Sequence, residues 1–136
     1  EATKSNTATK LGLDNNPGET ELEAMKLVAE NVFQPLRKKF GRTRVNSFFR
    51  SEALNKALRG SKTSQHRKGE AMDVDALDGT TNKEIFDYIR ENLDQLIGEG
   101  LDYDGDYSWV HFSYKKEGNR KQVLTMLGGK YFNYRE

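Results

Sequence analysis

Two histidines and one aspartate carry the clearest chemical signal in this sequence. His66 and His111 are the only histidines among the 136 residues, and Asp73 follows the first of them by seven positions. Two imidazoles and one carboxylate form a ligand set that zinc accepts, and three such ligands leave a fourth position for water. A lone histidine is more often structural than a ligand, so this interpretation requires all three side chains to meet. The absence of cysteine excludes disulfides, thiolate chemistry and cysteine-based zinc fingers.

The residues around Asp73 indicate how it can approach the first histidine. Residues 72–76 alternate apolar with acidic side chains, which predicts a strand that carries Asp73 and Asp75 on one face. Gly69 allows the chain to bend between His66 and Asp73, so the two side chains can converge. The simpler alternative is that the two carboxylates only form a solvated face of the strand.

The second histidine lies in a stretch with the same period of two. Alternation puts Trp109, His111 and Ser113 on one face of a predicted strand and the apolar residues between them on the other. One face must pack on helices, which leaves the other for a site. The alternative for His111 is a buried imidazole that is satisfied by a hydrogen bond.

These residues must be positioned by helices early in the chain and strands late in it. Apolar spacing predicts a helix from Thr20 to about Phe40, with a capping box at Thr20 and Glu23, and Pro35 should kink or shorten it. A short helix capped by Ser51 follows. A further helix is predicted from Thr81 to about Asn92, with a capping box at Thr81 and Glu84. Strands are predicted at residues 44–49, 71–76, 96–97, 108–114 and 122–127, with a loop at 59–69 and a turn at 117–119.

The predicted fold class is α+β, with a mostly antiparallel sheet packed by two or three helices. We expect strands 96–97 and 108–114 to form an antiparallel hairpin around the acidic turn at residues 102–106. The length fits one domain over residues 1–136, with an extended N-terminal arm at 1–14 and a C-terminal tail at 128–136.

The candidate ligands lie in two motifs, Ser64-x-His66-x-x-Gly69-x-Ala71-x-Asp73 and Trp109-Val110-His111-x-Ser113. Both resemble motifs of the zinc D-alanyl-D-alanine carboxypeptidase family, which also includes murein endopeptidases, and the chain is most similar to its small single-domain subgroup. Supporting stretches are Ser5-x-Thr7-Ala8-x-x-Leu11-Gly12-Leu13-Asp14-Asn15, Phe49-Arg50-Ser51-x-x-Leu54-Asn55 and Asp94-Gln95-Leu96-Ile97-x-Glu99. The resemblance implies a Hedgehog/DD-peptidase fold and one zinc ion held by His66, Asp73 and His111.

The general base is an open question at this point. Many enzymes of the family carry an acidic residue three positions before the last zinc histidine, and Ser108 stands there in this chain. Glu99 is one candidate, because it ends the strand that should pair with the His111 strand. Asp106 is the other, although acidic residues in turns are usually solvated.

Four further residues are candidates for substrate binding. Arg50 presents a donor fork for a carboxylate or carbonyl, and the resemblance associates arginine in that segment with substrate and catalysis. Ser64 and Gln65 orient their loop or donate to substrate. Trp109 is a candidate for a stacking rim together with Tyr103, Tyr107 and Tyr114, although some of these aromatic residues must serve the core.

The resemblance implies zinc-dependent hydrolysis of peptidoglycan stem or cross-link peptides, by a D,D-carboxypeptidase or an endopeptidase. The alternative is a non-catalytic zinc module that recognises a cell-wall peptide or a protein partner, because an acid is missing at Ser108. The 22 basic and 21 acidic residues give a net charge of +1, which argues against nucleic-acid binding.

The location follows from the expected substrate. No apolar stretch is long enough to insert in a membrane, and no signal peptide is evident at the start of this sequence. We expect a monomer that acts in the periplasm or outside the cell, or a phage-derived enzyme that is released to the cell wall.

Overall fold

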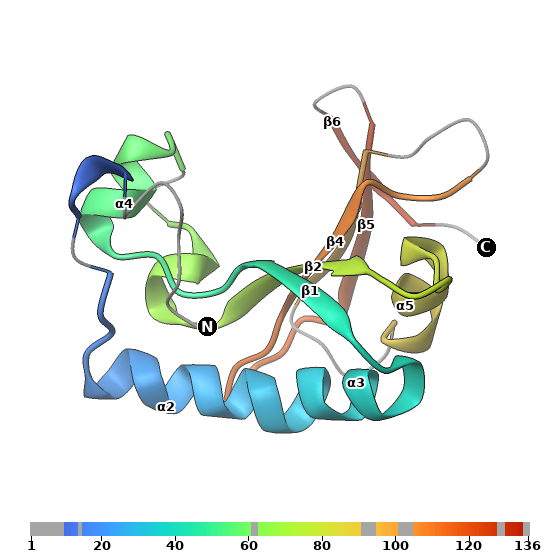
Figure 1. Ribbon diagram of the computed structural model, residues 1–136, viewed down its shortest axis with the longest axis horizontal. Helices are drawn as coiled ribbons and strands as arrows, with labels where there is room; N and C mark the ends of the chain where they lie inside the picture. The colour runs from blue at the N-terminus through green and yellow to red at the C-terminus, as the bar shows by residue number, and fades with distance from the viewer. Residues whose placement is uncertain are drawn as a thin grey trace.

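A single six-stranded sheet organises the described part of the chain. The computed structural model describes residues 10–13, 15–60, 63–90, 95–100, 105–127 and 130–134 (Figure 1). Within these ranges the strand order is β1-β2-β4-β3-β5-β6. The strands are β1 (Thr43–Ser47), β2 (Ala71–Ala76), β3 (Gln95–Glu99), β4 (Trp109–Ser113), β5 (Gln122–Leu127) and β6 (Lys130–Asn133). The prediction of an α+β fold with a mostly antiparallel sheet is confirmed, since all neighbouring strands are antiparallel except β3 and β5.

Helices cover one face of this sheet and form the core with it. A long helical segment comprises α2 (Glu19–Val28), a π-helical turn η1 (Ala29–Phe33) and α3 (Gln34–Phe40), and it runs beneath the sheet in Figure 1, with α5 (Asn82–Tyr88) beside it. The core side chains come from these helices and from alternate strand positions: Met25, Val28, Val32, Leu36, Met72, Val74, Ile85, Phe86, Leu96, Val110 and Phe112. Packing one sheet face in this way leaves the other face open for a site.

The first helix differs from its prediction at its N-terminal cap and is irregular near Pro35. The capping box at Thr20 is wrong, because the N-cap is Gly18, two residues earlier, and no side chain caps the helix. Acidic residues in the first turn favour that start through the helix dipole. Pro35 does not shorten the helical segment, which continues through α3 to Phe40. The π-helical turn η1 lies directly before α3, so the regular helix is interrupted close to this proline.

The shorter elements follow the sequence more closely. Ser51 caps α4 (Glu52–Ala57), its hydroxyl accepting from the backbone N–H of Leu54 at 3.2 Å. Thr81 likewise caps α5 by accepting from the backbone N–H of Glu84 at 3.1 Å. That helix ends at Tyr88, and the predicted extension to Asn92 lies partly outside the described residues. The predicted loop at 59–69 is corrected in part, because a 3-10 turn, η2 (Gln65–Lys68), forms inside it.

The strands agree with the prediction except at the C-terminal side. Strand β2 has the predicted bounds, and β3 and β4 form the predicted antiparallel pair. Strand β5 follows β4 in the chain but pairs with β3, which lies between them in the sheet, and it runs parallel to β3. A hairpin connection between β4 and β5 is therefore wrong. The tail prediction at 128–136 is also wrong in part, because β6 extends the sheet.

Both chain ends lie partly outside the described residues. The prediction of an extended arm at 1–14 falls mostly on residues that the structure does not describe, but Lys10 and Leu11 are helical, so the arm is not extended there. Among the described residues, no helix combines the length and the apolar character that crossing a bilayer requires.

Candidate metal centre

Strand pairing brings the aspartate and the second histidine together. Asp73 on β2 is the direct antiparallel partner of His111 on β4, so both side chains leave the same face of the sheet as neighbours. The residues on either side of them, Met72 and Val74 on β2, point into the core with at most 1% of their surface exposed. The period of two therefore settles which face carries the site.

The turn η2 brings in the first histidine from outside the sheet. The Ser64 hydroxyl accepts from the backbone N–H of His66 at 3.3 Å and caps this turn. Gly69 ends it with φ of +73°, and a Cβ on Gly69 would lie 2.6 Å from the carbonyl oxygen of Glu21. Both the left-handed conformation and the contact with α2 therefore require glycine, and the predicted bend is confirmed.

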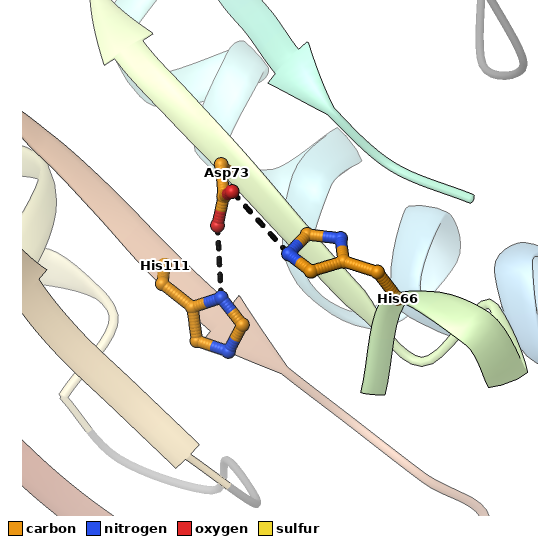
Figure 2. A group of neighbouring side chains, drawn as sticks. All are labelled: His66, Asp73 and His111. Atoms are coloured by element: carbon orange, nitrogen blue, oxygen red, sulfur yellow. Dashed lines mark hydrogen bonds and ion pairs between the residues drawn. The ribbon is translucent and has the colours of Figure 1, made fainter. Parts of the chain in front are cut away.

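The three side chains surround one point (Figure 2). Nε2 of His66 lies 3.3 Å from Oδ2 of Asp73, and Nδ1 of His111 lies 2.8 Å from Oδ1. The three residues each offer a ligand atom, and these atoms all lie within 4.8 Å of one another. His66 is buried and the other two are half-buried. Within the described residues, this is the group of histidine and acidic side chains that can hold a metal ion.

The outward nitrogen of each imidazole also has a partner. Nδ1 of His66 donates to the carbonyl oxygen of Phe48 at 2.7 Å, and Nε2 faces Asp73. Nε2 of His111 lies 3.2 Å from Oε1 of Gln65. Histidine ligands commonly donate their second N–H to a carbonyl or carboxylate, which fixes the tautomer and the ring orientation. The surroundings therefore orient both rings for binding a cation.

The donor set fits zinc. Zinc binds imidazole nitrogen and carboxylate oxygen at about 2.0–2.2 Å, so two atoms on one ion are at most about 4 Å apart. The atoms of this group lie within 4.8 Å of one another, so a small inward movement of the side chains brings them to that spacing. Two histidines and one aspartate also leave one tetrahedral position for water or substrate.

The charge of Asp73 is stabilised by its neighbours. Burial by itself raises the pKa of this carboxyl group, but hydrogen bonds with His111 and His66 outweigh burial and hold its pKa well below the ordinary value. The guanidinium group of Arg50 adds an ion pair at 3.5 Å. Asp73 is therefore ionised near neutral pH, the state in which a carboxylate binds a metal.

Arg50 lies beside the metal group and is held there by other residues. Its Nε donates to Oγ of Ser47 at 3.1 Å, and its backbone N–H donates to the carbonyl of His66 at 3.0 Å. The amide of Asn15 brackets it by donating to the carbonyl of Phe49 at 3.1 Å and accepting from the N–H of Ser51 at 2.8 Å. Sequence reasoning missed this role of Asn15, although the residue belongs to the N-terminal motif quoted above.

Glu99 on β3 lies on the same face of the sheet, two residues along the strand from the direct partner of His111. Ile97 is the β3 partner of His111, and Glu99 is the partner of Trp109, so Glu99 is diagonal to His111. Only 7% of its surface is exposed, and its Oε2 has no hydrogen-bond partner among the described residues. Burial raises the pKa of Glu99; His111 lowers it and the negative charge of Asp73 raises it further. A buried carboxylate with an unused oxygen and a raised pKa is suited to accept a proton.

The remaining predicted residues are found in different settings. The Asp106 carboxylate accepts from the backbone N–H of Lys83 at 2.7 Å, at the first turn of α5. Ser64 caps η2, Gln65 contacts His111, and Trp109 is half-buried on the metal face; substrate contact by these three stays a prediction. Tyr107 is a core residue with 4% exposure, and Tyr114 packs against the core. Tyr103 and Asp94 lie outside the described residues.

Comparison with known proteins agrees with this geometry. No curated protein matches the chain significantly. The model of the Peptidase M15 family matches residues 1–113, a segment that includes His66, Asp73, Glu99 and His111. Because this match covers most of the 136 residues, the chain belongs to the Peptidase M15 family, whose members are zinc-dependent metallopeptidases.

Proposed function

We propose that this chain hydrolyses peptide bonds in bacterial peptidoglycan, as a zinc-dependent D,D-carboxypeptidase or murein endopeptidase. The observation that carries the proposal is the meeting of His66, Asp73 and His111 on the open face of the sheet, in a member of a metallopeptidase family. A substrate of this kind places the site of action in the periplasm or outside the cell.

The residues of the chain divide the chemistry among them. His66, Asp73 and His111 would hold a zinc ion, which when bound would supply Lewis-acid chemistry for a peptide carbonyl and for water. Glu99 takes a proton from the attacking water as the new carbon–oxygen bond forms. It then delivers that proton to the leaving amine as the carbon–nitrogen bond breaks. Its raised pKa favours the first step, since a carboxylate that holds a proton too weakly cannot take one from water.

Arg50 orients the substrate. Its contacts with Ser47 and Asp73 fix the guanidinium group next to the metal group, with N–H donors suited to a carbonyl or a terminal carboxylate. Which of these it binds distinguishes an endopeptidase from a carboxypeptidase, because only the latter needs a subsite for a free C-terminus.

The test is hydrolysis of purified murein peptides, followed by mass spectrometry of the products. We expect turnover to disappear with a chelator, to return with added zinc, and to be absent in His66→Ala. Lys68→Ala is the matched control, because Lys68 is an exposed residue of the same turn η2. Turnover that survives both chelation and the His66→Ala substitution would rule the proposal out.

A non-catalytic zinc module is the second candidate, and the serine at position 108 favours it. Ser108 donates its hydroxyl to the carbonyl of Gly100 at 3.2 Å and offers no carboxylate. The position of Glu99 opposite Trp109 supplies an acid from another strand, so we favour the enzyme. A chain that binds zinc and murein peptides tightly but cleaves none of them would support the module instead.

A further inference from the structure

Two parallel rows of side chains cross the open face of the sheet. The metal row consists of Asn133, Leu124, Ile97, His111 and Asp73, on β6, β5, β3, β4 and β2. The Glu99 row lies two residues further along each strand and consists of Tyr131, Met126, Glu99 and Trp109. Register partners on adjacent strands point to the same face, so the Glu99 row leads from β4 directly to Tyr131 on β6.

Glu99 inside its row and Tyr131 at the β6 end of the row differ in exposure. Glu99 has 7% of its surface exposed and lies between its half-buried partners Met126 and Trp109. Tyr131 has 58% exposed, although it is a large aromatic residue on the face that carries the metal group. An exposed aromatic ring two strands away from a buried carboxylate, on the same face of the sheet, is an available contact surface for a ligand.

Electrostatics connect Tyr131 with the site. Partial burial raises the pKa of its phenol, and the negative charges of Glu99 and Asp73 raise it further. These carboxylates influence Tyr131 across the sheet, and the phenol consequently keeps its proton through the neutral range. Its hydroxyl can therefore act as a hydrogen-bond donor to a peptide carbonyl.

We propose that Tyr131 is a substrate-binding residue, whose ring and hydroxyl contact the murein peptide on the β6 side of the scissile bond. This inference rests on the proposed function. Arg50 flanks the metal group from the β1 side and Tyr131 from the β6 side, so a peptide that lies across the sheet meets both. Tyr131 also lies beyond residues 1–113 that the family model matches, so the contact that we propose is not one that the family match itself implies.

The test compares two variants with a matched control on the same hairpin. Tyr131→Ala removes ring and hydroxyl, Tyr131→Phe removes the hydroxyl alone, and Phe132→Ala is the control. Phe132 is 52% exposed, but it pairs with Thr125 and therefore points to the opposite face. The substrates are murein peptides shortened stepwise from each end, and kcat, KM and zinc content are measured for each protein.

We expect Tyr131→Ala to lower kcat/KM on the longest peptide about tenfold, mainly through KM, which corresponds to the loss of one good contact. Tyr131→Phe should lose about threefold, and Phe132→Ala should match the wild type. Shortening the substrate from one end should abolish the difference between Tyr131→Ala and the wild type, because the contacted group is then absent. Zinc content should not change in any variant.

Two results would overturn the inference while leaving the proposed function intact. One is an active wild type with the same kcat/KM in Tyr131→Ala on every peptide. The other is a loss in Tyr131→Ala that is equal for all substrate lengths and is shared by Phe132→Ala, which indicates a structural effect of the hairpin. A wild type without zinc-dependent hydrolysis instead overturns the proposed function itself, and the inference with it.

Discussion

The metal row and the Glu99 row each contain one buried or half-buried carboxylate, and the pKa values of these two groups shift in opposite directions. Asp73 in the metal row contacts His66, His111 and Arg50, and these contacts keep its pKa low. Glu99 in the neighbouring row has an oxygen without a partner among the described residues, and burial raises its pKa. The difference arises from neighbours only one row apart on the same sheet.

This contrast indicates two roles for one functional group. A carboxylate that is paired on both oxygens stays charged and is suited to hold a cation, whereas one with an unused oxygen in a dry setting can gain and lose a proton. A single rigid sheet can therefore position a ligand and a base side by side. Substitutions of the two carboxylates and of their neighbours test this contrast.

The first prediction concerns the charge in the metal row. Asp73→Asn should abolish peptide hydrolysis and weaken zinc binding by more than about a hundredfold, because even the loss of an outer partner costs about 10–100-fold. Asp75→Asn is the matched control, since Asp75 is on the same face of β2 but accepts from Asn82 at 2.7 Å instead. Zinc content by elemental analysis, with activity, checks the pair, and equal zinc retention in both variants contradicts the assignment.

The second prediction concerns the base in the Glu99 row. Glu99→Gln should lower kcat by about 10²–10⁴-fold, the usual contribution of a general base, while zinc binding is retained. Asp106→Asn should keep its turnover, since asparagine can still accept from the N–H of Lys83 at the start of α5. If instead Asp106→Asn is inactive and Glu99→Gln is active, the two roles must be exchanged.

A smaller effect is expected from the outer partner of His111. Gln65→Ala removes the oxygen that faces Nε2 of His111 and should weaken zinc binding by about 10–100-fold. Gln65→Glu retains an acceptor and should restore most of the affinity. Competition with a chromophoric chelator measures this series, and a Gln65→Ala protein with wild-type affinity would show that the contact does not orient the ring.

The smallest effect is on the stability of the metal-free protein. Folding raises the pKa of Glu99. Below the ordinary glutamate pKa the carboxyl group is protonated in both the folded and the unfolded state, so its ionisation does not affect stability. As pH rises from there through the raised pKa, the unfolded state ionises more easily, and the free energy of unfolding falls. Glu99→Gln removes this loss and should raise the melting temperature at pH 7 by about 2–6 °C. Thermal melts with a chelator should show the gain disappear near pH 4, and the exposed Glu23→Gln should show no gain at either pH.

Much of the fold could be predicted because local patterns have local physical causes. The alternation in Ala71–Ala76 matches the pleat of β2, and Ser51 and Thr81 cap their helices through backbone contacts three residues away. The helix start at Gly18 was missed because Thr20 satisfies the same capping rule without being used. Competing local signals of similar strength cannot be ranked from the sequence.

Strand β6 was missed although its sequence contains a signal. Gly128 and Gly129 separate Leu127 from Lys130, and a two-glycine spacer between short strands is a hairpin signature. The prediction treated this region as a tail, so Tyr131 was not considered as a residue of the site. The parallel position of β5 beside β3 was not accessible in the same way, because it depends on which strand β4 has already paired with.

The side chains that can bind zinc, and the face of each strand that carries them, were predictable, because residue type and a period of two are local properties. The sequence also indicated Glu99 and Arg50 through the resemblance of their segments. Three features became visible only in the folded protein. Asp73 pairs with His111 across two strands. The Phe48 carbonyl and Gln65 contact the outer nitrogens of the two imidazoles, and Oε2 of Glu99 has no hydrogen-bond partner among the described residues. Those features depend on strand register and burial, which join residues far apart in the chain and leave no local pattern.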